Sequence, residues 1–252
     1  MTAFLTSYTF LIGLMFGSFY NVVGLRVAQS EGFFSSRSRC PRCGHTLSWV
    51  ELIPVVSFLL QRGKCRSCAT RISYLYPLVE VTTAVLFVVS LMMFGFQMEL
   101  WLSLALMSLF MIVFVSDMTY MIIPDKVLLF FLPIFVILRF LEPLSPWYAS
   151  ILGAIVGGGL LAIIIIVSKG GMGAGDMKLF ALLGIVLGVK KVLLALFLST
   201  LTGAVISGML VIMGIIDRKK PIPFGPYIIL GSIVAYLVGE SMIDWYVTTL
   251  FR

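Results

Sequence analysis

The sequence contains little charge and almost no histidine. Only 12% of its 252 residues are charged, whereas a soluble domain usually carries about 25%. Hydrophobic residues make up 60% of the chain, and the mean hydropathy is +1.11. This balance excludes an ordinary soluble domain and favours a membrane protein. His45 is the only histidine, which disfavours a protease that pairs histidine with a serine or cysteine nucleophile.

Long apolar runs account for most of the sequence. A helix needs about 20 residues to cross the hydrocarbon core of a bilayer, so we expect an all-α polytopic membrane protein with about eight transmembrane helices. The expected spans cover residues 3–25, 74–95, 99–116, 127–141, 148–168, 177–189, 192–215 and 226–243. The first run lacks a basic start and a cleavage-site pattern, so we expect it to remain as a membrane helix. The glycines within 153–162 are expected to let helices pack closely.

Basic residues gather between the first two expected spans. They are Arg26, Arg37, Arg39, Arg42, Arg62, Lys64, Arg66 and Arg71. Only Glu31 and Glu51 oppose them, so by the positive-inside rule this segment is cytoplasmic and the N-terminus lies outside. Basic cytoplasmic loops also explain the net charge of +7, and we expect no nucleic-acid partner.

The same count places three later segments, 117–126, 168–178 and 217–226, on the cytoplasmic side. We therefore expect a multi-pass protein of the inner or plasma membrane. Its parts would be a first span (1–27), a cytoplasmic insert (28–73) and a transmembrane core (74–252).

All four cysteines lie in the insert. They form two C-x2-C pairs, Cys40 with Cys43 and Cys65 with Cys68. Two such pairs place four thiolates around one tetrahedral zinc ion, and the reducing cytosol disfavours disulfides. Four reduced, unliganded cysteines are the alternative. A zinc ion with four sulfur ligands has no open position, so its role would be structural. His45 lies beside the first pair and is expected to be a bystander.

Three acids lie at expected membrane edges. Asp117 follows the third span, Asp125 precedes the fourth, and Asp176 lies in the glycine-rich segment "GMGAGDMK" at 171–178. Ionisable groups at membrane depth are costly and often mark function. Asp125 and Asp176 could instead be helix-capping residues, and Asp117 could be an ordinary acid at a helix end.

The expected topology places Asp117 and Asp176 on the same membrane face. Neighbouring spans could bring the two carboxylates together, and the glycines before Asp176 allow a substrate backbone to approach. Two close carboxylates share one proton. The ionised partner can then take a proton from water while the protonated partner donates one, which is the chemistry of aspartic proteases.

Several stretches occur together in a specific order: "GSFYNVV", the two C-x2-C pairs, "YPLVE", "SDMTYMIIPD", "GMGAGDMKLF" and "PIPFGPY". With this set the chain resembles the bacterial type 4 prepilin peptidases over nearly its whole length. The overall pattern is most similar to the competence-type enzymes of Gram-positive bacteria.

The resemblance implies specific residues and activities. It implies that Asp117 and Asp176 are the catalytic aspartates, and it does not imply catalysis by Asp125. Family members cut a short basic leader from prepilin or pseudopilin proteins beside an apolar helix, in contact with membrane lipid. Many then methylate the new N-terminus with S-adenosylmethionine, so the resemblance implies this cofactor, whereas no common methyltransferase loop occurs in the insert. It also links the cysteine insert to zinc.

Two other classes of protein remain open on the residues alone. A cation or proton transporter could use Asp117 and Asp176 as ion-binding or proton-relay groups, with the insert as a zinc sensor. A membrane-anchored zinc ribbon that binds nucleic acid is the third alternative, and the expected position of its basic residues already has another explanation.

Overall fold

The protein is described by a computed structural model that covers residues 2–29, 37–169, 171–215, 217 and 222–250. The described residues form helices and loops, with two isolated β-bridges and no strand. The membrane helices are α1 (Thr2–Ala28), α3 (Leu75–Phe94), α4 (Met98–Tyr120), α5 (Asp125–Leu141), α6 (Ala149–Val167), α7 (Ala174–Ile212) and α8 (Gly225–Leu250). The expected all-α fold class is confirmed for this part of the chain.

Six of these helices, all except α5, are long and apolar enough to cross a membrane. Large apolar side chains on them face outward rather than into a core: Phe4 is 74% exposed, Ile155 63% and Trp245 67%. Such side chains are stable in contact with lipid and costly in water. The chain is therefore a multi-pass membrane protein.

The chain divides into two compact units, Met1–Thr119 and Tyr120–Arg252. The first unit holds α1, the insert, α3 and α4, and the second holds α5 to α8. The boundary falls within the expected transmembrane core (74–252), in the last turn of α4, which also contains Asp117. Of the expected cytoplasmic segment 217–226, residues 218–221 lie outside the described residues, as does Glu31 of the insert.

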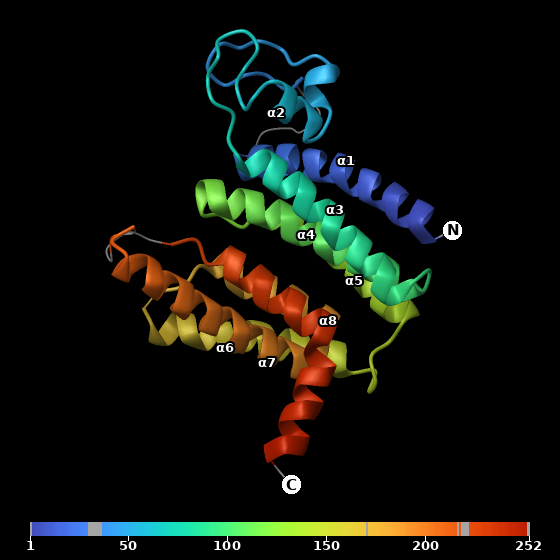
Figure 1. The fold of residues 1–252 in the computed structure, drawn as a ribbon. Helices are drawn as coiled ribbons and strands as arrows, with labels where there is room; N and C mark the ends of the chain where they lie inside the picture. The colour runs from blue at the N-terminus through green and yellow to red at the C-terminus, as the bar shows by residue number, and fades with distance from the viewer. Residues whose placement is uncertain (1, 30–36, 170, 216, 218–221, 251–252) are drawn as a thin grey trace. The chain divides into compact units, whose positions relative to one another are not determined.

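Glycines bring the helices of the first unit into close contact. A Cβ on Gly17 would lie 2.6 Å from the Cα of Glu80, so α1 and α3 approach backbone to backbone there. Near the end of α1, a Cβ on Gly24 would lie 2.9 Å from the carbonyl oxygen of Ile112 in α4. Figure 1 shows α1 and α3 side by side, with the insert at their shared end.

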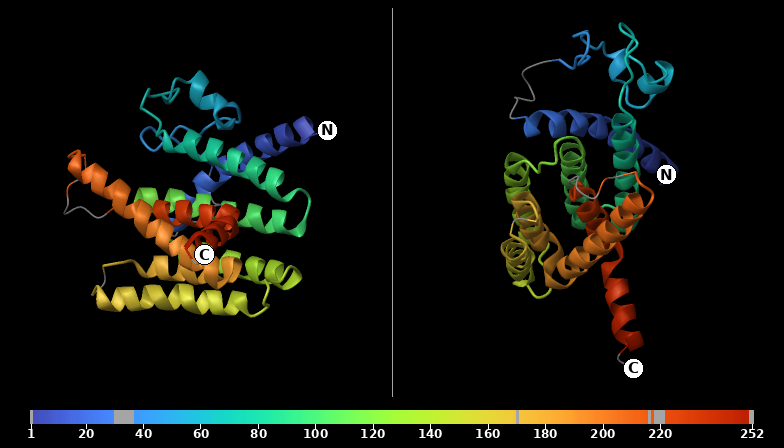
Figure 2. Two further views of the ribbon diagram at one scale, coloured as in Figure 1. Left: turned by 60° about the horizontal axis from the view of Figure 1, so that its bottom comes forward. Right: turned by 90° about the vertical axis from the view of Figure 1, so that its left-hand side faces the viewer.

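Glycines also bring α6 and α7 into close contact in the second unit. A Cβ on Gly153 would overlap the carbonyl oxygen of Gly184, and a Cβ on Gly184 would overlap that of Gly153. The expected packing role is confirmed for Gly153 and Gly157, whereas nothing lies within 4 Å of a Cβ on Gly159. Figure 2 shows α6 and α7 in this neighbouring arrangement. Within lipid the hydrophobic effect does not drive helices together. Small residues instead let the helix backbones approach closely, and van der Waals contacts then stabilise the pair.

Helix α7 is broken at Gly188, whose φ of 71° and ψ of 179° are not helical. A Cβ on Gly157 would lie 2.5 Å from the carbonyl oxygen of Phe180 and 3.1 Å from Cγ2 of Val192. In a straight helix, residues 180 and 192 would be about 18 Å apart. The second half of α7 therefore folds back along the first, and the expected spans 177–189 and 192–215 are separate helices within one continuous element.

Arg139 of α5 stabilises this break. Its Nε and Nη2 donate to the carbonyl oxygen of Val186 at 3.0 and 2.8 Å. Because the helix stops at Gly188, that carbonyl has no partner one turn later, and a buried carbonyl needs one. The guanidinium also places a positive charge at the C-terminal end of a helix, where the helix dipole favours it.

Candidate active site and metal centre

The four cysteine side chains of the insert meet at one point. The Sγ atoms of Cys40 and Cys68 are 3.8 Å apart, and those of Cys43 and Cys65 are 3.9 Å apart. All four lie within 4.8 Å of one another. A tetrahedral zinc site with Zn–S bonds of about 2.3 Å has sulfurs about 3.8 Å apart. The cluster thus has the composition and the dimensions of a four-thiolate metal site.

The two C-x2-C pairs sit on matching loops. In the first loop the Cys40 N–H donates to the His45 carbonyl, and in the second the Cys65 N–H donates to the Thr70 carbonyl. Each loop turns through a residue of positive φ, which is Gly44 in the first and Ala69 in the second. An isolated antiparallel bridge closes each loop, between Arg39 and Thr46 and between Lys64 and Arg71. The two loops thus share one geometry, and all four sulfur ligands of the cluster come from the insert.

Hydrogen bonds within these loops favour thiolates at Cys40 and Cys68. At Cys43 the His45 N–H lowers the pKa, but burial and the neighbouring thiols outweigh it and raise the pKa to about 12. The backbone N–H groups of Cys43 and Arg42 lower the pKa of Cys40. The hydroxyl and then the N–H of Thr70 lower the pKa of Cys68 to about 6. Ionised sulfur is the form that binds a metal, so hydrogen bonds prepare Cys40 and Cys68 for one.

His45 lies outside the sulfur cluster, as expected. Its Nε2 is 3.4 Å from Oε2 of Glu51, and Glu51 also accepts hydrogen bonds from the Ser48 N–H (2.9 Å) and hydroxyl (2.8 Å). The Ser48 donors, followed by His45, hold the pKa of the Glu51 carboxyl below its usual value. Glu51 is therefore an ionised carboxylate in the insert.

Asp117 lies in the last turn of α4 and is only 5% exposed. The sequence placed it after a span that ends at residue 116, whereas α4 continues to Tyr120. The carboxylate thus belongs to the helix itself, on a segment whose preceding residues, Val115 and Ser116, are also buried. An ordinary acid at the end of a membrane helix would turn outward to water instead.

Asp176 lies in the first turn of α7 and is 8% exposed. The helix begins at Ala174 with Gly173 as its N-cap, so Asp176 is the third helical residue rather than the cap. Its Oδ2 accepts a hydrogen bond from the Gly173 N–H at 3.3 Å. A carboxylate is favoured in this position by the free N–H groups and dipole of the helix start.

Two contacts attach the segment around Asp176 to the start of α5. A Cβ on Gly175 would lie 3.0 Å from the Cβ of Ile123, and Lys178 Nζ lies 2.6 Å from Asp125 Oδ2. The alternative that Asp125 is the helix cap is wrong, because Pro124 is the N-cap of α5 and Asp125 is the first helical residue. Its side chain is 67% exposed, and its ion-pair partner is Lys178 rather than the neighbouring Lys126. An exposed, paired acid of this kind has a structural role.

Sequence reasoning missed a polar cluster between α1 and α3. Glu80 is 7% exposed, and its Oε2 accepts a hydrogen bond from the Val55 N–H at 2.8 Å. Val55 has a φ of 61°, so the carboxylate holds a strained turn of the insert against the membrane helices. Beside it, Asn21 donates to the Tyr76 carbonyl at 3.2 Å. The signal in the sequence was the presence of Asn21 and Glu80 inside apolar runs.

Comparison with known proteins covers nearly the whole chain. Residues 11–94 match the bacterial peptidase A24 N-terminal domain, and residues 104–208 match the type IV leader peptidase family. A prepilin leader peptidase/N-methyltransferase of Bacillus subtilis (strain 168) is 45% identical over 96% of this chain and 97% of its own length. Proteins with the same name from Aeromonas salmonicida and Pseudomonas aeruginosa are 36% and 31% identical, over 97% and 94% of this chain and 94% and 92% of their own. No solved structure matches.

Proposed function

The chain belongs to the type IV leader peptidase family, and we propose that Asp117 and Asp176 are the two carboxylates with which this membrane peptidase cleaves prepilin-like proteins. The cleavage takes place at the cytoplasmic face of the plasma membrane. Both residues fall within the one stretch, 104–208, that matches the family. The other described acids of that stretch include Asp125 and Glu142, which are exposed.

The observation that carries this proposal is the burial of both carboxylates at the ends of apolar helices. Asp117 and Asp176 are 5% and 8% exposed, whereas acids without a special role in a membrane protein turn to water. Chain connectivity favours their meeting. Gly175, next to Asp176, packs on Ile123, and the six residues from Asp117 to Ile123 span at most about 20 Å.

The chemistry follows from two carboxylates that share one proton. The ionised carboxylate takes a proton from a water molecule, whose oxygen attacks the carbonyl carbon of the scissile peptide bond. The protonated carboxylate donates its proton to the carbonyl oxygen, and the resulting tetrahedral intermediate collapses as the amine leaves with a proton. Neither residue needs a histidine partner, which agrees with the single histidine of the chain.

The expected substrate suits a site at this depth. A prepilin carries a short basic leader before an apolar helix, so the leader stays at the cytoplasmic surface while the helix enters the bilayer. The peptide bond between the leader and the helix then lies at the membrane interface. In the expected topology, the last turn of α4 and the first turn of α7 lie at this depth. A glycine at the cleavage site lets the substrate backbone extend toward the catalytic carboxylates.

The insert supplies the second part of the proposed function. Its four cysteines bind zinc in a structural role, since four sulfur ligands leave no open position for catalysis. The relatives are named as N-methyltransferases, and we extend that activity to this chain. When bound, S-adenosylmethionine supplies a methyl group on a positively charged sulfur for transfer to the new N-terminal amine.

Mass spectrometry of a prepilin-like substrate tests the peptidase assignment. The substrate has a basic leader, a glycine at the cleavage site and an apolar helix, and the enzyme is purified in lipid nanodiscs. We expect the wild type and Asp125→Asn to release the leader after the glycine. Asp117→Asn and Asp176→Asn should leave the substrate intact while keeping the melting temperature of the wild type.

Cleavage by either of those two variants would remove that residue from catalysis. If no variant and no wild-type preparation cleaves several pilin-like substrates, a transporter that uses the two carboxylates for ions would be the better account.

A further inference from the structure

The insert carries an exposed apolar segment at residues 49–60, "WVELIPVVSFLL". It contains η1 (Val50–Leu52) and α2 (Val56–Leu60). Its most exposed apolar side chains, with exposed fractions between 44% and 79%, are those of Trp49, Leu52, Val56, Leu59 and Leu60. Grouped apolar side chains of this kind are costly in water and mark a surface that contacts another apolar phase.

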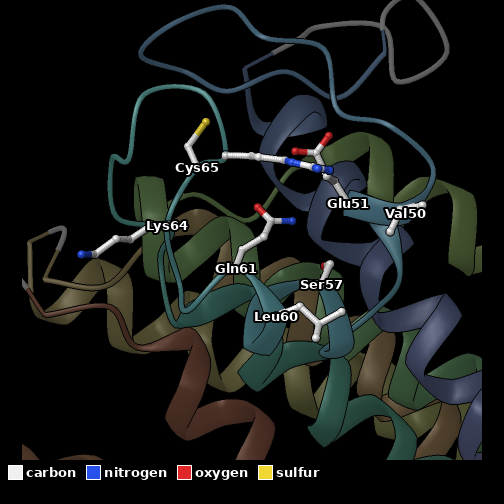
Figure 3. A pocket seen from close by; sticks show the side chains of 8 residues that line it. Val50, Glu51, Ser57, Leu60, Gln61, Lys64 and Cys65 are labelled. Carbon is white, nitrogen blue, oxygen red and sulfur yellow. The ribbon is translucent and has the colours of Figure 1, made fainter.

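The interior side of this segment is polar. A cavity of about 440 Å³ lies beside the cysteine cluster (Figure 3). Its walls include Glu51, Ser57, Gln61 and Arg66. Ser57 and Gln61 are one helical turn apart, so α2 and its C-cap present polar side chains to the cavity. Val56 and Leu59 lie outside the cavity and are exposed. The segment therefore separates polar from apolar side chains as a helix at an interface does.

A hydrogen bond sets the level of this segment along α3. The Val55 N–H donates to Glu80 Oε2 at 2.8 Å. Glu80 is the sixth residue of α3, so it lies about 8 Å along the helix axis from Leu75. The 20 residues of α3 have a length of about 30 Å, which is just enough to cross the hydrocarbon core. Val55 therefore lies beside the membrane-crossing part of α3 rather than above its end.

A second contact holds α2 near the start of α3. The rings of Phe58 and Tyr74 meet edge to face, with their centroids 5.6 Å apart, and Tyr74 directly precedes α3. A Cβ on Gly63 would lie 3.1 Å from Cζ of Phe58, so the turn after α2 packs on the same ring. Because Val55 and Phe58 are both attached here, the apolar segment stays at this level of the helix.

The residues that follow the segment are basic. Arg62, Lys64 and Arg66 are exposed, and the sequence contains no acid between Glu51 and Glu80. In Figure 3 the Lys64 side chain extends away from Leu60, from the loop that follows α2. Basic side chains next to apolar and aromatic ones are typical of segments that lie in a membrane interface, where they meet anionic headgroups.

We propose that residues 49–60 form an interfacial membrane-binding segment, whose apolar side chains enter the lipid bilayer and whose basic flank binds anionic headgroups. Lipid is the partner because of the level at which the segment lies. Beside Glu80, the exposed Leu78 and Val81 belong to the lipid-facing surface of α3, and the segment continues that surface. Interfacial helices enter the bilayer by about 5–10 Å, which agrees with the position of Val55.

This contact gives the insert an attachment to the membrane besides its two chain connections to α1 and α3. Trp49 would lie among the headgroups, where tryptophan is enriched in membrane proteins. The proposal is independent of the peptidase and methyltransferase activities, because it depends only on where the insert lies.

Quenching of Trp49 fluorescence by brominated lipids tests the proposal on the full-length, zinc-loaded protein. Trp101→Phe, Trp147→Phe and Trp245→Phe leave Trp49 as the only tryptophan. The protein is placed in nanodiscs of phosphatidylcholine and phosphatidylglycerol, with bromine either near the start or near the end of the acyl chains. We expect the bromines near the start of the chain to quench Trp49 more strongly, and iodide in the water to quench it weakly.

The matched control moves the tryptophan to the first cysteine loop. In the same background, Trp49→Phe with Arg42→Trp places it at an exposed position outside the apolar segment. Iodide should quench this control strongly and bromine should not, and zinc content verifies that both proteins keep the insert folded. Quenching of Trp49 by iodide as strong as in the control, or no quenching by bromine, would overturn the proposal.

A photocrosslink tests the same surface with all four tryptophans in place. Leu59 is replaced by p-benzoylphenylalanine, the nanodiscs are irradiated with and without a prepilin-like substrate, and adducts are identified by mass spectrometry. We expect an adduct with phospholipid under both conditions. An adduct with the prepilin or with a second copy of the chain in its place, or no adduct at all, would overturn lipid as the partner.

Discussion

At the scale of single residues, the site depends on which acids the protein buries. Asp117, Asp125 and Asp176 look alike in the sequence as acids beside apolar runs, and only their surroundings separate them. Asp125 is exposed and paired with Lys178, whereas Asp117 and Asp176 are buried. The sequence singled out Asp117 and Asp176 as candidate catalytic residues, and their catalytic role stays a prediction. It could not predict that Lys178 partners Asp125, because that contact joins α5 to α7.

Gly175 gives the first prediction at this scale. Its virtual Cβ lies 3.0 Å from the Cβ of Ile123, so a branched side chain must push the start of α7 away from the segment before α5. A displacement of about 1 Å in a catalytic group can cost about a hundredfold in rate. We expect Gly175→Val to lower prepilin cleavage by about that factor, measured as the initial rate in nanodiscs.

Gly159→Val is the control for this change. Nothing lies within 4 Å of a Cβ at that position, so Gly159→Val should cleave at close to the wild-type rate. Equal rates for Gly175→Val and the wild type would show that the contact with Ile123 does not position Asp176.

At the scale of secondary-structure elements, the reversal within α7 organises the second unit. Two apolar runs in the sequence predicted two spans there, 177–189 and 192–215, and the break at Gly188 separates two helices at that point. The role of Arg139 was not predictable, since an arginine near the end of an apolar run normally indicates a membrane edge. Its actual partner, the Val186 carbonyl, becomes available only because α7 stops at Gly188.

Arg139 therefore gives a prediction about stability. Arg139→Met leaves the buried Val186 carbonyl without its two donors, and an unpaired buried acceptor costs about 1–3 kcal/mol. We expect a clear drop in the thermal midpoint measured by circular dichroism in detergent. Arg139→Lys should lose less, because an ammonium still donates one hydrogen bond to this carbonyl. Equal midpoints for Arg139→Met and the wild type would contradict this role.

At the scale of the whole molecule, different interactions stabilise the insert and the membrane helices. The helices are stable in lipid through close contacts at glycines, whereas the insert has a small core and several exposed apolar side chains, among them Trp49 and Leu60. Cysteine spacing alone predicted the sulfur cluster, because two C-x2-C pairs allow few other arrangements. The cavity beside it was not predictable, since Glu51 and Arg66 come together only when the loops close.

Removing the metal should therefore affect one part of the molecule. Metal binding contributes directly to the folding of small domains of this type, so Cys68→Ser, which removes one ligand, should abolish zinc binding and expose the insert to trypsin. Cleavage is expected at its basic residues, such as Arg62 and Lys64. The helical circular dichroism signal should stay close to that of the wild type. An insert that resists trypsin without zinc would contradict a structural role for the metal.

The division after Thr119 has a consequence for catalysis. Asp117 belongs to the first unit and Asp176 to the second. The sequence motifs identified both residues, whereas single-sequence patterns carry no information about a boundary between compact units. The proposed mechanism therefore requires the two carboxylates to act together.

The most direct test measures single-turnover cleavage rates for Asp117→Asn, Asp176→Asn and the double variant, with the prepilin-like substrate in excess lipid. Groups that act as one unit are strongly non-additive. We predict that each single variant loses at least about a thousandfold in rate and that the double variant is no slower than either. A double variant whose loss equals the product of the two single losses, or a single variant that keeps near-wild-type cleavage, would contradict the paired-aspartate mechanism.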